Sequence, residues 1–108
     1  MAKIKMKIER DANEIKYISI LRKEVNKSIS EIKKLISNND YILSYNLLDM
    51  DEMIEIEKIV SLLLKADAKV HLYENNREVS IEFLNNLIES YQDTENYMEE
   101  IDEQMDKY

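Results

Sequence analysis

The sequence predicts a two-layer α+β domain, with three strands in one layer and helices in the other, followed by a long C-terminal α-helix. Three observations predict it. Apolar and charged residues alternate in the first segment, apolar residues recur every three or four positions elsewhere, and Ser28, Asp49 and Ser80 stand where helices should begin. The expected order is β-α-α-β-α-β-α, with residues 1–79 forming the domain and residues 80–108 an acidic helix.

The first strand is predicted at residues 2–9, where every second residue from Ala2 to Ile8 is apolar and most of the others are lysine. A first helix is predicted over residues 14–25. Its apolar face is Ile15, Ile18, Leu21 and Val25. Asn26 is expected to adopt the left-handed conformation that ends this helix.

A second helix is predicted over residues 28–37, with Ser28 as N-cap and Glu31 completing a capping box. Ile29 and Ile32 begin its apolar face, which continues with Leu35 and Ile36. A polar turn at residues 38–40 then leads into a second strand at residues 41–47, which is rich in aromatic and branched side chains.

Asp49 is expected to cap a third helix over residues 49–66, with Leu48 packed on Met53 as a hydrophobic staple. Its buried stripe is predicted to be Met53, Ile56, Val60, Leu63 and Leu64. A third strand follows at residues 69–73 and a polar turn at residues 74–78. The second strand, third helix and third strand should form a right-handed crossover, with the first strand antiparallel to that pair.

The composition excludes several classes of site. A chain of 108 residues with no Cys, Gly or Pro has no disulfide, no thiolate zinc site and no glycine-rich phosphate loop. Its apolar runs are short and interrupted by charge, so we expect neither a membrane span nor a signal peptide. These features favour a cytoplasmic protein.

The net charge of −8 belongs to one segment. Residues 80–108 contain nine acids and one lysine, whereas acids and bases balance over residues 1–79. The segment is therefore expected to bind a protein with a basic surface. Its candidate contact residues are Glu89, Tyr91, Asp93, Glu95, Tyr97, Glu99, Glu100, Asp102 and Glu103.

The same segment has a heptad spacing of apolar residues, which favours a coiled-coil homodimer. The residues at these positions are Leu84, Leu87, Tyr91, Met98, Ile101 and Met105. An alternative remains open, in which the first half of the helix packs on the domain and the acidic second half frays.

No residue pattern predicts catalysis, a metal or a cofactor. His71 is the single histidine, and a general base or metal ligand needs partners that the sequence does not supply. Asp49, Asp51, Glu52 and Glu55 begin a helix, where acids are explained by the helix dipole. The basic N-terminal third would bind nucleic acid if its lysines gathered on one face with aromatics between them, but alternating strand lysines favour a solvated face.

Residues 21–36 resemble the helix-corner-helix of the C-terminal domain of the bacterial ribosomal stalk protein. The family pattern V-R-E-I-T-G-L-G-L-K-E-A-K-D-L-V aligns with them without a gap, and Arg22, Glu31, Lys33 and Leu35 are identical. The resemblance implies a three-stranded fold over residues 3–73 and a surface that recruits translational GTPases. Ile18, Arg22 and Lys33 match that surface.

Two hypotheses of function follow, and a third, an enzyme, would be reopened only by a deep polar pocket that contains His71. The first is a non-catalytic, acidic protein-protein interaction module of the inhibitor, immunity or antitoxin kind, which masks a basic partner. The second, implied by the resemblance, is a stalk-like domain associated with the ribosome or a translation factor.

Overall fold

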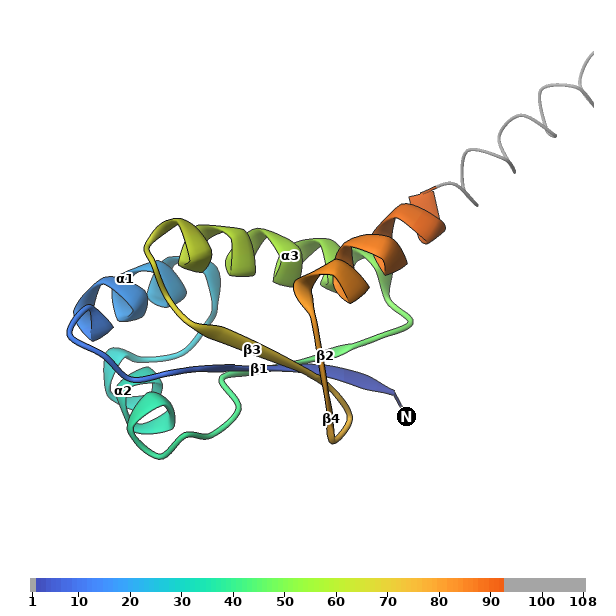
Figure 1. Cartoon of the computed structure of the whole chain (residues 1–108). Helices are drawn as coiled ribbons and strands as arrows, with labels where there is room; N and C mark the ends of the chain where they lie inside the picture. The colour runs from blue at the N-terminus through green and yellow to red at the C-terminus, as the bar shows by residue number, and fades with distance from the viewer. Residues whose placement is uncertain (1, 93–108) are drawn as a thin grey trace, which may run out of the picture.

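A computed structural model of the chain describes residues 2–92 and shows an α+β fold with a four-stranded antiparallel sheet and four helices (Figure 1). The elements, in chain order, are β1 (Lys3–Ile8), α1 (Glu14–Glu24), α2 (Ile29–Ser37), β2 (Leu43–Asn46), α3 (Met50–Lys65), β3 (Val70–Glu74), β4 (Arg77–Val79) and a helix over residues 81–92. The β-α-α-β-α-β order expected through residue 73 is therefore present.

The sheet has the order β2-β1-β3-β4, with β1 in the interior. Met6 of β1 pairs with Leu43 on one side and Leu72 on the other, both in antiparallel register. β2 and β3 therefore run parallel to each other, but β1 lies between them. The connection through α3 thus crosses over β1 instead of joining neighbouring strands.

The prediction of three strands was wrong, because the chain turns after β3 and adds a fourth strand, β4, which pairs with β3 as a hairpin. Asn75 begins its turn with φ 56°, a conformation that asparagine tolerates better than most residues. The Asn75 side chain also accepts a hydrogen bond from the Lys3 backbone N–H at 3.1 Å. A strand of three residues is too short for periodicity to reveal, so this segment reads as a polar turn in the sequence.

The core lies between the sheet and the helices, and the strand alternation places Ile4, Met6 and Ile8 in it. The buried residues of α3 are Met53, Ile56, Ile59, Val60 and Leu63. Leu64, which was expected in that stripe, is 45% exposed.

The predicted helix caps at Ser28, Asp49 and Ser80 are all confirmed by hydrogen bonds. Ser28 Oγ accepts from the Glu31 N–H at 3.1 Å, and Asp49 Oδ1 accepts from the Glu52 N–H at 3.2 Å. Asn26 does not have the predicted left-handed backbone, since α1 ends with Val25 in an extended conformation. The predicted staple is also wrong, because Leu48 is 72% exposed.

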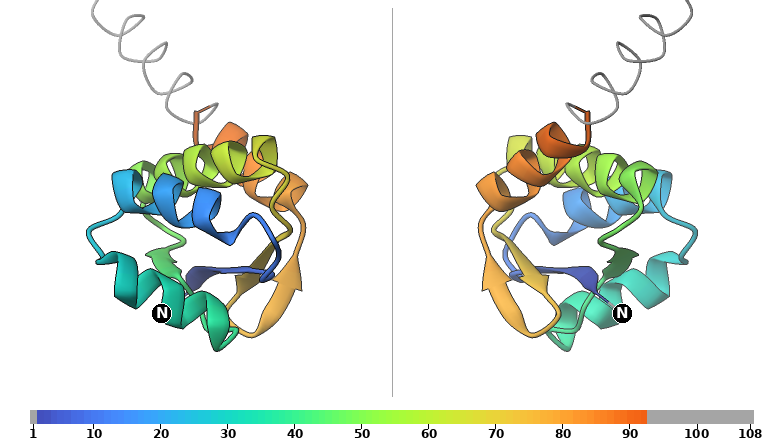
Figure 2. Two further views of the ribbon diagram at one scale, coloured as in Figure 1. Left: turned by 90° about the vertical axis from the view of Figure 1, so that its left-hand side faces the viewer. Right: turned by 90° about the vertical axis from the view of Figure 1, so that its right-hand side faces the viewer.

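The helix over residues 81–92 begins at Ser80, whose Oγ accepts from the Phe83 N–H at 3.3 Å. It lies on the same side of the sheet as α1 and α3 (Figures 1 and 2). Leu84 and Ile88 are buried in the common core, and Leu87 packs against it. This first part of the predicted C-terminal helix is therefore helical and packs on the domain, while residues 93–108 lie outside the described residues.

Candidate functional site: a basic groove between α1 and α2

A groove of about 680 Å³ lies between α1 and α2. We call it the α1–α2 groove, and it is lined by Arg10, Glu14, Ile15, Ile18, Ser19, Arg22, Lys23, Ile29 and Lys33. The two helices stand together at one end of the molecule, the end that faces the viewer in the left view of Figure 2.

Local sequence features hold the two helices in this arrangement. Leu21 of α1 and Ile32 of α2 are both fully buried in the core. Tyr17 is buried as well, and its hydroxyl donates a hydrogen bond to Asp11 at 2.8 Å, which fixes the start of α1. Burial and this hydrogen bond raise the pKa of the Tyr17 hydroxyl. The groove is therefore built on a rigid base.

The apolar part of the groove consists of three isoleucines. Ile18 is almost buried, but Ile15 is 83% exposed and Ile29 is 52% exposed. Fully burying such a side chain is worth about 1.5–3 kcal/mol, so two exposed isoleucines in one groove leave a large hydrophobic gain unused in the isolated protein. Adjacent exposed apolar side chains of this kind are typical of a binding surface.

The charges around these isoleucines are mostly positive. Arg10 forms an ion pair with Glu14, with 3.4 Å between Nε and Oε2. Among the ion pairs of residues 2–92, none includes Arg22, Lys23 or Lys33, and all three side chains are exposed. The groove therefore combines an apolar strip with three cations that have no counter-charge within the described chain.

The three residues singled out by the stalk resemblance, Ile18, Arg22 and Lys33, all line this groove. Sequence reasoning missed Arg10, Lys23 and the role of Ile15 and Ile29. Periodicity identifies the apolar face of each helix, and it placed both isoleucines on the core side. It gives no sign that the fold leaves the outer edge of that face uncovered.

Comparisons of the chain with models of protein families, with curated proteins and with solved structures give no match. The groove is therefore interpreted from its own geometry.

The acidic contact surface predicted for residues 80–108 falls mostly outside the described residues. Glu89 is exposed on the helix over residues 81–92, and Tyr91 is half-buried, with its hydroxyl donating to the Leu47 carbonyl at 3.0 Å. Leu84, a proposed self-association residue, is fully buried in its own core, so it does not lie on an open face. The residues that lie outside are Asp93, Glu95, Tyr97, Met98, Glu99, Glu100, Ile101, Asp102, Glu103 and Met105.

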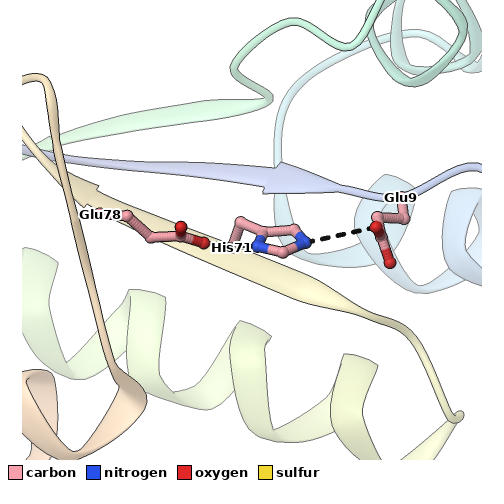
Figure 3. Close-up of polar contacts among 3 residues, drawn as sticks. All are labelled: Glu9, His71 and Glu78. Carbon is pink, nitrogen blue, oxygen red and sulfur yellow. Dashed lines mark hydrogen bonds and ion pairs between the residues drawn. The ribbon is translucent and has the colours of Figure 1, made fainter.

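His71 lies between the carboxylates of Glu9, which follows β1, and Glu78, which belongs to β4 (Figure 3). Its Nε2 is 3.7 Å from Glu9 Oε1, and its Nδ1 is 2.6 Å from Glu78 Oε1. His71 also borders a second hollow, of about 450 Å³, between α3, β3 and β4. The side chains of His71 and Glu78 in that hollow contact each other, whereas Arg22, Lys23 and Lys33 of the α1–α2 groove have no ion-pair partner within residues 2–92.

Two of the acidic residues at the start of α3 accept local hydrogen bonds. Asp49 caps the helix, and Glu52 Oε2 accepts from the Asn46 N–H at 2.6 Å. Within residues 2–92, no group of three or more His, Cys, Asp or Glu side chains is placed to hold a metal ion, and no helix is long and apolar enough to cross a membrane.

The face of the sheet opposite the core brings lysines and aromatic rings together. The Lys7 ammonium lies 4.6 Å from the centre of the Tyr41 ring and 5.5 Å from that of Tyr73, and Lys5 lies 5.0 Å from the Tyr41 ring. The two rings also pack edge to face. Lysines and aromatic rings therefore share this face, the arrangement that a nucleic-acid surface would need.

Proposed function

We propose that this protein is a non-catalytic protein-interaction module, and that its α1–α2 groove binds an acidic, amphipathic helix of a partner protein. The observation that carries this proposal is the combination of exposed Ile15 and Ile29 with Arg22, Lys23 and Lys33, which have no ion-pair partner within residues 2–92, in one groove. A strip of apolar side chains with cations along its edge complements a helix that has an apolar face bordered by carboxylates.

The two kinds of contact have different roles. Covering Ile15 and Ile29 supplies most of the affinity, because both side chains lose water when the partner docks. The cations supply selection among partners and a faster encounter, since they attract acidic segments and repel basic ones. Binding should therefore weaken, but not vanish, as added salt screens the exposed charges.

The stalk resemblance suggests one class of partner. In that family the matching surface recruits translational GTPases, and Ile18, Arg22 and Lys33 occupy the matching positions here. Glu14 and Ser19, which also line the groove, replace two lysines of the family surface. Association with the ribosome or a translation factor is therefore a proposal about the partner's identity, separate from the proposal about its chemistry.

A second candidate function is supported by the charge distribution. Residues 80–108 have nine acids and one lysine, which suits a protein of the inhibitor, immunity or antitoxin kind that masks a basic partner. In this case the partner binds the acidic segment, and reversing charges in the α1–α2 groove leaves its affinity unchanged.

The test uses a synthetic amphipathic peptide with isoleucines at helical spacing and glutamates along the flanks, and a second peptide with lysines in place of the glutamates. We expect the acidic peptide to bind and to shift backbone NMR signals of the groove residues, and the basic peptide not to bind. The double variant R22E/K33E should weaken binding at least about tenfold, which corresponds to about 1.4 kcal/mol.

The chain offers a matched control. Lys16 and Lys34 lie on the same two helices and are exposed, but neither lines the groove. K16E/K34E changes the net charge by the same amount and should affect binding much less. Equal losses in the two double variants, or signal shifts located elsewhere on the surface, would show that the groove is not the binding site.

A further inference from the structure

We propose that residues 93–108 of one copy of this chain dock in the α1–α2 groove of a second copy. The proposal rests on the function proposed above, in which the groove receives acidic amphipathic segments, and it names a segment of the chain itself as an occupant. Self-association of this kind covers the groove and makes external partners compete for it.

The sequence of residues 93–108 has the chemistry that the groove requires. It contains seven acids and one lysine, and its acids surround a set of apolar residues. Tyr97, Ile101 and Met105 follow one another at intervals of four, which places them along one side of any helix that the segment forms. This stripe is the counterpart of Ile15, Ile18 and Ile29.

The charges match in the same way. On such a helix Glu100 and Asp102 lie about 100° to either side of Ile101, whereas Arg22, Lys23 and Lys33 border the isoleucines of the groove. Within the described residues these three cations have no ion-pair partner. Docking brings opposite charges together along both sides of an apolar contact. Such charge pairs fix the position of the segment along the groove and also add affinity.

The position of residue 92 favours a second copy over the same molecule. The hydrogen bond from Tyr91 to the Leu47 carbonyl holds this part of the chain near the start of α3, and α1 and α2 stand at the opposite end of the molecule (Figure 1). Residues 93–108 number the same as the 16 residues of α3. A helix of this length spans about 24 Å, which is also the length of α3. In its own molecule such a helix would therefore extend only along α3 and would end before the groove.

An extended segment of this length reaches about 54 Å and could return to its own groove, but it would not present Tyr97, Ile101 and Met105 on one side. Docking in a second copy has no such restriction. Two copies that exchange their segments make the same contact twice, which closes a symmetric dimer. This dimer differs from a coiled coil, because its contact needs the groove.

The experiment measures self-association of the full chain by sedimentation equilibrium in about 0.1 M and about 1 M salt. We expect a dimer whose dissociation constant rises at least about tenfold in the higher salt. The groove variant R22E/K33E and the segment variant E100K/D102K should each be monomeric at concentrations where the unchanged chain is dimeric, whereas K16E/K34E should remain dimeric.

A mixture of the groove variant and the segment variant gives the decisive result. The first retains its acidic segment and the second its groove, so the mixture should associate one to one although neither variant associates alone. Dimerisation of R22E/K33E by itself, at the strength of the unchanged chain, would overturn the proposal in favour of a heptad coiled coil.

The acidic peptide separates this proposal from the proposed function. Suppose that E100K/D102K binds the peptide more tightly than the unchanged chain, but that the unchanged chain stays monomeric at every concentration. The groove function then stands, the segment docks in its own molecule, and the second-copy proposal is wrong. Absence of both peptide binding and self-association would overturn both proposals.

Discussion

Replacing Ile15 with alanine should separate binding from folding more cleanly than any other change in the α1–α2 groove. The side chain is 83% exposed, so folding already leaves most of it in water. Removing it costs the fold only a few tenths of a kcal/mol, and the better helix propensity of alanine offsets much of this loss. We therefore expect the free energy of unfolding to change by less than about 0.5 kcal/mol.

The effect on binding should be much larger. At about 0.8 kcal/mol for each buried methylene, a partner that covers Ile15 loses about 2 kcal/mol when the side chain is shortened to alanine, or about 30-fold in Kd. Titration calorimetry with the acidic amphipathic peptide measures this loss, and urea unfolding measures the stability. The same substitution at Ile18, which is only 8% exposed, should instead destabilise the fold by about 2–4 kcal/mol.

Leu48 provides the control, since it is 72% exposed but lies outside the groove. Leu48→Ala should leave both peptide affinity and stability nearly unchanged. The reasoning fails if Ile15→Ala binds the peptide as well as the unchanged protein does. It also fails if Ile15→Ala unfolds as easily as Ile18→Ala, because Ile15 would then be part of the core.

Two further predictions concern the fold. Asp49→Ala removes the side chain that caps α3, so the free energy of unfolding should fall by about 1 kcal/mol. Asp49→Asn keeps a capping oxygen and should restore most of this loss. Equal stability of all three proteins in urea would contradict the cap. The raised pKa of Tyr17, due first to burial and then to Asp11, means that the folded state resists ionisation above the ordinary value of 10.0. This contribution to stability is complete below pH 10.0 and is lost as the pH rises further. Tyr17→Phe should therefore reduce the fall in melting temperature with pH in the alkaline range. An unchanged slope of melting temperature against pH would refute this prediction.

Local signals in the sequence predicted most of the elements, because their determinants are local. Alternation in β1 and the caps at Ser28 and Asp49 each depend on residues within one or two turns, and the structure shows all three. The hairpin at Asn75 was missed because three residues carry no usable period. The interior place of β1 depends on pairing between distant strands, which no local pattern encodes.

Part of the α1–α2 groove was also predictable from the sequence. Aligned residues pointed to Ile18, Arg22 and Lys33, and the structure brings them together. The exposure of Ile15 and Ile29 depends on how two helices share one core. An apolar residue at the edge of a helical stripe is covered only if another element reaches it, and no pattern within the helix itself predicts whether one does.

The interior position of β1 has a consequence for how the protein is made. On the ribosome, Lys3–Ile8 is synthesised long before Val70–Glu74, yet both edges of this strand need partners before the sheet exists. The nascent chain therefore carries an apolar strand with at least one unpaired edge until nearly all of the domain has emerged. Folding should begin late and in one cooperative step, and a stalled chain that lacks β3 would expose Ile4, Met6 and Ile8 to chaperones.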